Sequence, residues 1–132
     1  MSGNRYFLDT NAIIQLLQGN EDLIKLLTHA DYIAVSIISK IEFLSFTKLS
    51  SNDKKLFEKF LNKVTVYDLV ADDYELIQKI VNFRQKKALK LPDAIIAAKS
   101  NLCECILVTA DRKLASALRD VYEFSVINCS HS

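Results

Sequence analysis

Short apolar segments alternate with longer amphipathic ones along the whole chain, and this alternation constrains the fold more than any other feature. Five short runs are apolar throughout, as in strands covered on both faces: 6–8, 33–35, 64–67, 105–108 and 125–127. Helical periodicity marks the remaining segments: 11–18, 22–28, 37–49, 53–62, 72–87, 92–100 and 112–118. Strands separated by helices pair in parallel through right-handed crossovers. We therefore expect an α/β fold, a three-layer α/β/α sandwich around a five-stranded parallel sheet.

The composition favours a single domain and removes several other classes of protein. With 132 residues, 50% of them hydrophobic, the chain has the size of one domain (1–132), and we expect short mobile tails at 1–4 and 129–132. Only two glycines and one proline occur, which disfavours turn-rich all-β folds. The same scarcity of glycine excludes a Walker phosphate loop and a dinucleotide-binding fingerprint.

The sequence gives no sign of export or of membrane insertion. No apolar run approaches the roughly 18 residues that a membrane-spanning helix needs. Arg5 and Asp9 flank the short apolar patch near the N-terminus, which is unlike a signal peptide. The three cysteines are an odd number, so we expect a cytoplasmic protein with reduced thiols and no membrane partner.

Acidic residues occur where the predicted strands end or shortly afterwards. Asp9 and Asp111 follow two of the strands, and Asp93 lies in the first turn of the small, apolar helix 92–100. Glu42 lies in the helix that follows the second strand. Because sites in parallel α/β sheets form at the carboxyl ends of the strands, we expect these four carboxylates to share one pocket. Two like charges ~4 Å apart repel by about 4 kcal/mol at an effective dielectric constant of 20, so the group needs a cation.

The residue types indicate which cation and which chemistry this would be. Ligands that are all oxygen atoms select hard ions such as Mg²⁺ or Mn²⁺ over zinc. Such an ion suits phosphodiester hydrolysis, because it binds the phosphate and lowers the pKa of a water molecule. His29 lies in a polar loop and His131 is the penultimate residue, so neither suits a histidine-driven ribonuclease or a serine triad.

Each aspartate also has a simpler interpretation. Asp9 and Asp111 could cap the helices that follow them, and Asp93 could interact favourably with a helix dipole. Glu42 is different, because it lies in the middle of an apolar helix, where a charge needs a polar partner. Glu42 therefore favours a shared site over three separate helix caps.

Four motifs occur in order along the chain: 6–11 (Tyr-Phe-Leu-Asp-Thr-Asn), Ser36 with Ser39 and Glu42, 91–98 (Leu-Pro-Asp-Ala-Ile-Ile-Ala-Ala) and 107–111 (Leu-Val-Thr-Ala-Asp). Together they resemble the PIN domain, and most closely the VapC-type toxins of bacterial and archaeal toxin–antitoxin pairs. The resemblance extends from the first strand to the last helices. The segment 91–98 is its most specific motif, whereas Asp-Thr-Asn after a strand is weakly specific alone.

The resemblance implies a PIN-like sheet order of 3-2-1-4-5 and an Mg²⁺- or Mn²⁺-dependent endoribonuclease, the toxin of its pair, that hydrolyses RNA through metal-activated water. It assigns catalysis and metal binding to Asp9, Glu42, Asp93 and Asp111. It assigns supporting polar roles to Thr10, Asn11, Ser39 and Thr109. It further implies a homodimer and a cognate antitoxin protein whose C-terminal segment covers the site. Aromatic side chains that could form a partner groove, or simply pack in the core, are Tyr32, Phe43, Phe46 and Phe57.

A basic stretch is a candidate edge for binding the RNA backbone. The segment from Lys79 to Lys90 holds five basic residues and no acidic one, although the net charge of the whole chain is only +1. The tentative RNA-binding residues are Arg84, Lys86, Lys87 and Lys90. A solvated helix face is the alternative interpretation of this stretch.

Other classes of function remain open at this stage. A phosphatase with an aspartyl nucleophile would also place Asp9 after the first strand, but it needs a second aspartate where this chain has Asn11. A non-catalytic RNA- or protein-binding module on the same scaffold is a further alternative, which the complete acidic set disfavours. Four potential zinc ligands have a spacing that matches no recognised zinc site: Cys103, Cys105, Cys129 and His131.

Overall fold

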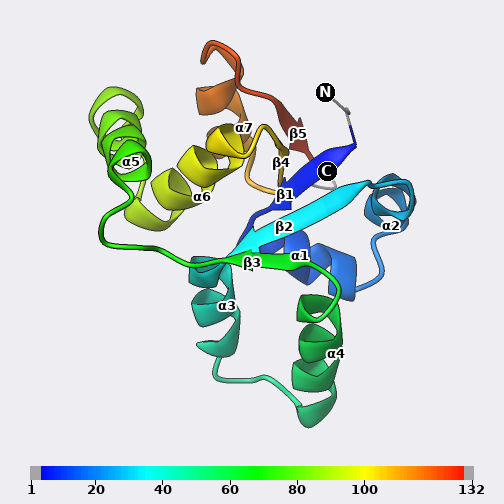
Figure 1. Cartoon of the computed structure of the whole chain (residues 1–132). Helices are drawn as coiled ribbons and strands as arrows, with labels where there is room; N and C mark the ends of the chain where they lie inside the picture. The colour runs from blue at the N-terminus through cyan, green and yellow to red at the C-terminus, as the bar shows by residue number, and fades with distance from the viewer. Residues whose placement is uncertain (1–3, 130–132) are drawn as a thin grey trace.

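In the computed structural model, residues 4–129 are described and form a five-stranded parallel sheet between two layers of helices (Figure 1). The strands are β1 (Arg5–Leu8), β2 (Tyr32–Ser36), β3 (Thr65–Tyr67), β4 (Ile106–Thr109) and β5 (Val126–Asn128). Their order is β3-β2-β1-β4-β5, and every neighbouring pair is parallel. This arrangement confirms the predicted α/β class and the sheet order implied by the resemblance.

The expected tails fall mostly outside the described residues. Asn4 and Cys129 are described, and each makes a backbone hydrogen bond. The Asn4 carbonyl accepts from the N–H of Asp31 at 2.9 Å, and the N–H of Cys129 donates to the Thr109 carbonyl at 2.8 Å.

The helices divide between the two faces of the sheet. They are α1 (Thr10–Leu17), α2 (Glu21–Thr28), α3 (Ile37–Leu44), α4 (Ser51–Leu61), α5 (Tyr74–Lys87), α6 (Leu91–Leu102) and α7 (Arg112–Arg119). In Figure 1, α1, α3 and α4 lie on one face, and α5, α6 and α7 lie on the other. Within the described chain, no helix is both long enough and apolar enough to cross a membrane.

Adjacent residues of the central strands fill two separate cores. Phe7 and Leu107 pack against α5, α6 and α7, while Leu8 and Val108 pack against the helices of the other face. Successive side chains of a strand point to opposite faces, and all four of these are fully buried. Burial on both faces explains why these strands are apolar throughout rather than alternating.

Helix α3 is shorter than the sequence predicts, ending at Leu44 rather than at residue 49. The Ser45 hydroxyl donates to the Ile41 carbonyl at 2.7 Å, and the N–H of Phe46 donates to the Phe43 carbonyl at 3.2 Å. Serine and threonine compete with helical hydrogen bonding through such local contacts, and the segment 45–50 is rich in them. The helix therefore ends early, and Phe46 lies in the loop that leads to α4.

Candidate active site

A pocket of about 170 Å³ lies at the carboxyl edge of the sheet and collects side chains from four separate segments. Its lining is Asp9, Thr10, Asn11, Glu42, Phe46, Asp93, Ile96 and Asp111. The structure thus brings together the four carboxylates that the sequence places near strand ends. None of the described lining residues is basic. The pocket is consequently a concentration of like charge.

Asp9 is both the N-cap of α1 and a wall of this pocket. Its Oδ1 accepts from the N–H of Ala12 at 2.8 Å, and its Oδ2 accepts a short hydrogen bond from the Thr109 hydroxyl. The residue is only 5% exposed. Burial raises the pKa of the Asp9 carboxyl to about 6, and the nearby charges of Asp93 and Asp111 act in the same direction. Helix capping and site formation are therefore compatible for this residue.

Thr109 connects Asp9 with Asp111. While the Thr109 hydroxyl donates to Asp9, its oxygen accepts from the N–H of Asp111 at 3.0 Å. Asp111 caps α7, since its Oδ1 accepts from the N–H groups of Lys113 and Leu114 at 2.9 and 3.1 Å. Thr109 is fully buried, so a side chain in the protein interior holds the two carboxylate residues in place.

Glu42 has the polar partner that its position within a helix requires. The Thr10 hydroxyl donates to Oε1 of Glu42 at 2.5 Å, and the same Thr10 oxygen lies 2.9 Å from the hydroxyl oxygen of Ser39. Ser39 is fully buried and does not line the pocket, so its contact with the site runs through Thr10. Asn11, by contrast, is exposed and lines the pocket.

Asp93 lies in the first turn of α6, where Lys90 is the N-cap residue and makes no side-chain capping bond. Burial raises the pKa of the Asp93 carboxyl, the charges of Asp111 and Glu42 raise it further, and Lys90 opposes them. The direction of this shift is the one expected when like-charged carboxylates line one pocket.

The basic residues singled out in the sequence lie outside the pocket lining. Arg84 and Lys86 are exposed near the C-terminus of α5, and Lys87 forms an ion pair with Asp120 at 2.7 Å. Lys90 is the member of this group that is near enough to affect Asp93. The structure therefore separates Lys87, which is paired within the protein, from Lys86 and Lys90 on the exposed edge.

The donor set of the pocket fits a hard divalent cation in its chemistry and in its unbalanced negative charge. The candidate ligands are carboxylate oxygens, which Mg²⁺ and Mn²⁺ prefer. Among residues 4–129, no three acidic, histidine or cysteine side chains already surround a common point. Among the described residues, the cysteines of the zinc alternative therefore form no metal-binding cluster either. His131, the fourth residue of that alternative, lies outside the described residues. Buried Cys105 instead directs its thiol at the Cys103 carbonyl.

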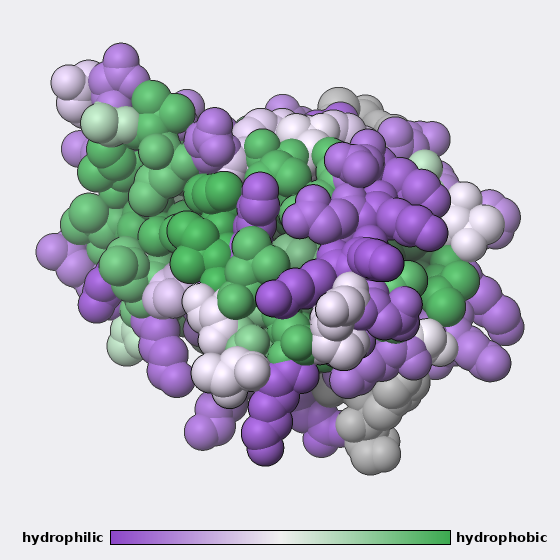
Figure 2. Space-filling model, turned by 90° about the horizontal axis from the view of Figure 1, so that it is seen from below, coloured by the Kyte–Doolittle hydropathy of each residue, from purple (hydrophilic) through white to green (hydrophobic). Residues whose placement is uncertain are grey.

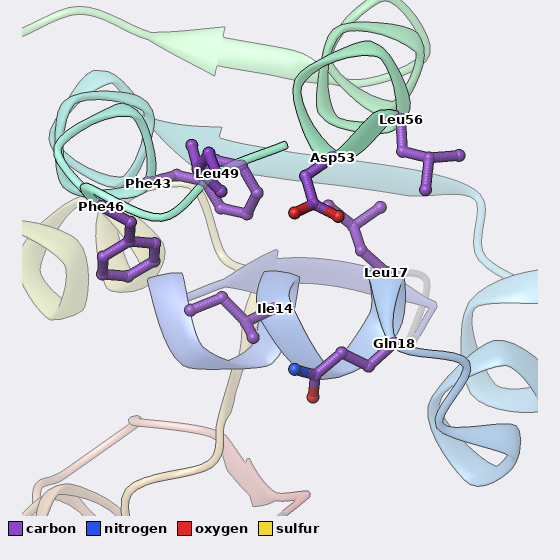
Figure 3. Close-up of a pocket in the computed structure, with 8 residues that line it drawn as sticks. All are labelled: Ile14, Leu17, Gln18, Phe43, Phe46, Leu49, Asp53 and Leu56. Atoms are coloured by element: carbon purple, nitrogen blue, oxygen red, sulfur yellow. The ribbon is translucent and has the colours of Figure 1, made fainter. Parts of the chain in front are cut away.

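A second cavity adjoins this site, and Phe46 lines both. It is an apolar groove of about 200 Å³, with α1 on one side and α4 with the loop after α3 on the other (Figure 3). Its lining is Ile14, Leu17, Gln18, Phe43, Phe46, Leu49, Asp53 and Leu56. Apolar surface also gathers across the left and centre of the molecular face seen in Figure 2. In the sequence, the three-residue spacing of Ile14 and Leu17 indicates an apolar face on α1, since residues three apart share a helix face.

Two of the four candidate groove aromatics line this groove, namely Phe43 and Phe46. Phe57 is fully buried and stacks on Phe43 with ring centroids 4.0 Å apart. Tyr32 packs in the core on the other face of the sheet. For these last two residues, packing in or against the core is the correct interpretation.

The fold and the pocket define an α/β protein with an acidic site at the carboxyl edge of a parallel sheet. The chain belongs to the PIN domain family, whose model matches residues 6–119. No curated protein matches the chain.

Several solved structures have a similar fold. A toxin–antitoxin complex from Klebsiella pneumoniae has a chain with 23% identity and a TM-score of 0.75, with 96% of this chain and 99% of that chain covered. VapBC2 from Rickettsia felis, bound to a DNA fragment from its promoter, gives 20% identity and a TM-score of 0.72, covering 93% and 97%. VapBC-1 from nontypeable Haemophilus influenzae gives 20% identity and a TM-score of 0.67, covering 94% and 97%.

Proposed function

We propose that this PIN domain protein is an Mg²⁺- or Mn²⁺-dependent endoribonuclease and the toxin of a toxin–antitoxin pair. The observation that carries the proposal is the pocket of four carboxylates, with no basic residue in its described lining and with the pKa of Asp9 raised to about 6. Membership of the PIN domain family supports it, as does the similarity to toxin–antitoxin complexes. The protein would act on RNA in the cytoplasm.

Each residue of the pocket has a role in this proposal. Asp9, Glu42, Asp93 and Asp111 would hold the cation. When bound, the cation supplies Lewis acidity for hydrolysis of the phosphodiester bond. The hydrogen bond from Thr109 orients Asp9, and the hydrogen bond from Thr10 orients Glu42. Thr10 is itself in hydrogen-bond contact with Ser39. Asn11, which is exposed and lines the pocket, would donate a hydrogen bond from its amide to the phosphate.

Substitution of single carboxylates tests the proposed function. In Asp9→Asn or Asp93→Asn, cleavage of a mixed RNA substrate with Mn²⁺ should fall at least about 100-fold, because each variant removes a charge that holds the cation. The circular dichroism spectrum should stay unchanged. Asp72→Asn, on the exposed segment before α5, is the matched control and should retain full activity. Full activity in Asp9→Asn, or a covalent phosphate on Asp9, would contradict the proposal.

Metal binding supplies a second measurement that does not depend on finding the right RNA. A ligand that binds only the native state raises the melting temperature, so Mn²⁺ should stabilise the wild-type protein and have little effect on Asp9→Asn. If Mn²⁺ changes neither the melting temperature nor RNA cleavage, the domain is a non-catalytic binding module.

We further propose two protein partners, a cognate antitoxin and a second copy of the chain. The apolar groove between α1 and α4 offers the antitoxin a surface of apolar side chains with Asp53 beside them. Three exposed apolar residues on one face of α5 offer a surface to the second copy: Tyr74, Ile77 and Val81.

A further inference from the structure

Phe46 belongs to both cavities. Its side chain lines the acidic pocket beside the carboxylates and also lines the apolar groove, where Figure 3 shows it at the end of the cavity next to α3. Phe46 follows the early end of α3, and the residue is 44% exposed. Leaving a phenylalanine this exposed sacrifices part of the free energy that burial would supply, so the exposed ring needs an explanation.

Within the acidic pocket, Phe46 is the lining residue that presents apolar surface. The other apolar lining residue, Ile96, is only 1% exposed. Behind Phe46 lies an aromatic stack. Phe43 packs against it with ring centroids 5.8 Å apart at 57°, and Phe43 in turn stacks on buried Phe57. The ring therefore has a firm support behind it and open surface beside the carboxylates.

A nucleotide has the two chemical parts that this arrangement matches. Its phosphodiester group suits a cation held by carboxylates, and its base is a flat ring attached through the sugar a few ångströms away. Proteins bind unpaired bases by stacking them on aromatic side chains, and this contact tolerates any base because every base has a π-face. A base within a duplex is already stacked, so it cannot use such a ring.

We propose that Phe46 is a positioning residue on which the base next to the cleaved phosphate stacks. This inference rests on the proposed endoribonuclease function. It has a consequence for regulation, because the same ring lines the apolar groove. A protein segment that fills the groove and covers Phe46 excludes the base without touching any carboxylate.

Two substitutions of Phe46 separate stacking from packing. Phe46→Leu keeps an apolar side chain against Phe43 but removes the π-face, whereas Phe46→Trp keeps an aromatic ring. The matched control is Leu44→Ala, which removes a similarly exposed apolar side chain that lines neither cavity. All three are prepared with and without Asp9→Asn, so that binding can be measured without cleavage.

The probe is a short single-stranded RNA that contains 2-aminopurine, whose fluorescence falls when it stacks on an aromatic ring. Phe46→Leu should weaken binding of this RNA at least about fivefold and abolish the quenching. In the cleaving background, its KM should rise while kcat changes less. Phe46→Trp should restore both binding and quenching, and Leu44→Ala should match the wild type.

The outcomes distinguish this inference from the proposed function. If Phe46→Leu binds and quenches like the wild type while RNA is still cleaved, the stacking role is wrong and the endoribonuclease assignment stands. If Phe46→Leu loses only the binding of a protein partner, the ring serves the groove and the inference is also wrong. If RNA is bound with quenching but never cleaved, the stacking surface is supported and the nuclease proposal fails. If the protein that retains Asp9 neither binds nor cleaves RNA in the presence of Mn²⁺, both proposals are wrong.

Discussion

Asp9 is hydrogen-bonded through both of its oxygens, yet its pKa is about 6. The donors are a backbone N–H and a hydroxyl, which orient the carboxylate but bring no positive charge. Burial and the charges of Asp93 and Asp111 therefore outweigh them. Relative to the ordinary pKa of 3.8, this shift means that ionised Asp9 lowers the free energy of unfolding of the metal-free protein by about 3 kcal/mol.

The pH dependence of stability follows from this raised pKa. Between about pH 4 and about pH 6, the folded state binds the Asp9 proton more tightly than the unfolded state does. The free energy of unfolding of the metal-free protein should therefore fall as the pH rises through this range. Asp9→Asn should reduce the fall and raise the free energy of unfolding at pH 7 by about 1–3 kcal/mol, since asparagine also caps a helix well. Urea unfolding in EDTA at several pH values measures this.

The exposed residue Asp72 supplies the control for this prediction, because Asp72→Asn changes the same atoms outside the pocket. Its stability should follow the wild-type pH dependence. Two results would contradict this explanation. Asp9→Asn could be less stable than the wild type at pH 7, or its free energy of unfolding could fall with rising pH as much as that of the wild type. In either case the buried charge of Asp9 would not cause the pH dependence of stability.

At the scale of elements, the strands and most helices could be predicted because their buried residues follow simple periodicities. The end of α3 could not, since the apolar pattern continues through Phe46 and Leu49 while local hydroxyl contacts end the helix. The positions of the acidic residues after strands indicated a shared pocket. The bonds that orient them, from Thr10 to Glu42 and from Thr109 to Asp9, join residues far apart in sequence, so only the fold shows them.

The turn between α5 and α6 allows a test of the proposed RNA-backbone edge. Lys86 in the last turn of α5 and Lys90 at the N-cap of α6 are exposed, whereas Lys87 forms an ion pair with Asp120. If Lys86 and Lys90 contact phosphates, Lys86→Gln with Lys90→Gln should weaken RNA binding and reduce the slope of log K against log salt by about 1–2. Binding titrations at several salt concentrations in the Asp9→Asn background measure the slope.

A second pair of exposed lysines provides the control for charge alone. Lys25 on α2 and Lys63 before β3 lie on segments that lead into the amino ends of strands, away from the acidic pocket. Lys25→Gln with Lys63→Gln should leave the slope near its wild-type value. An unchanged slope in the Lys86 and Lys90 variant would make the α5 stretch a solvated helix face.

At the scale of the whole molecule, two of the apolar surfaces that residues 4–129 leave exposed suit a protein partner. One is the groove between α1 and α4, and the other is the face of α5 that carries Tyr74, Ile77 and Val81. Exposed apolar patches of this kind are typical of protein interfaces. The two surfaces lie on opposite layers of the sandwich (Figure 1).

Light scattering during size-exclusion chromatography tests both partners in one experiment. The wild-type protein should have about twice the 15.0 kDa mass of one chain, and Ile77→Lys with Val81→Lys should have the mass of one chain, because buried lysine charges oppose the contact. Leu56→Asp places a charge in the groove, so it should remain dimeric but lose the complex with the cognate antitoxin. Ile24→Asp, an exposed site outside the groove, should keep that complex. A wild-type mass of 15.0 kDa would contradict the dimer, and an undiminished complex with Leu56→Asp would contradict the groove as the antitoxin site.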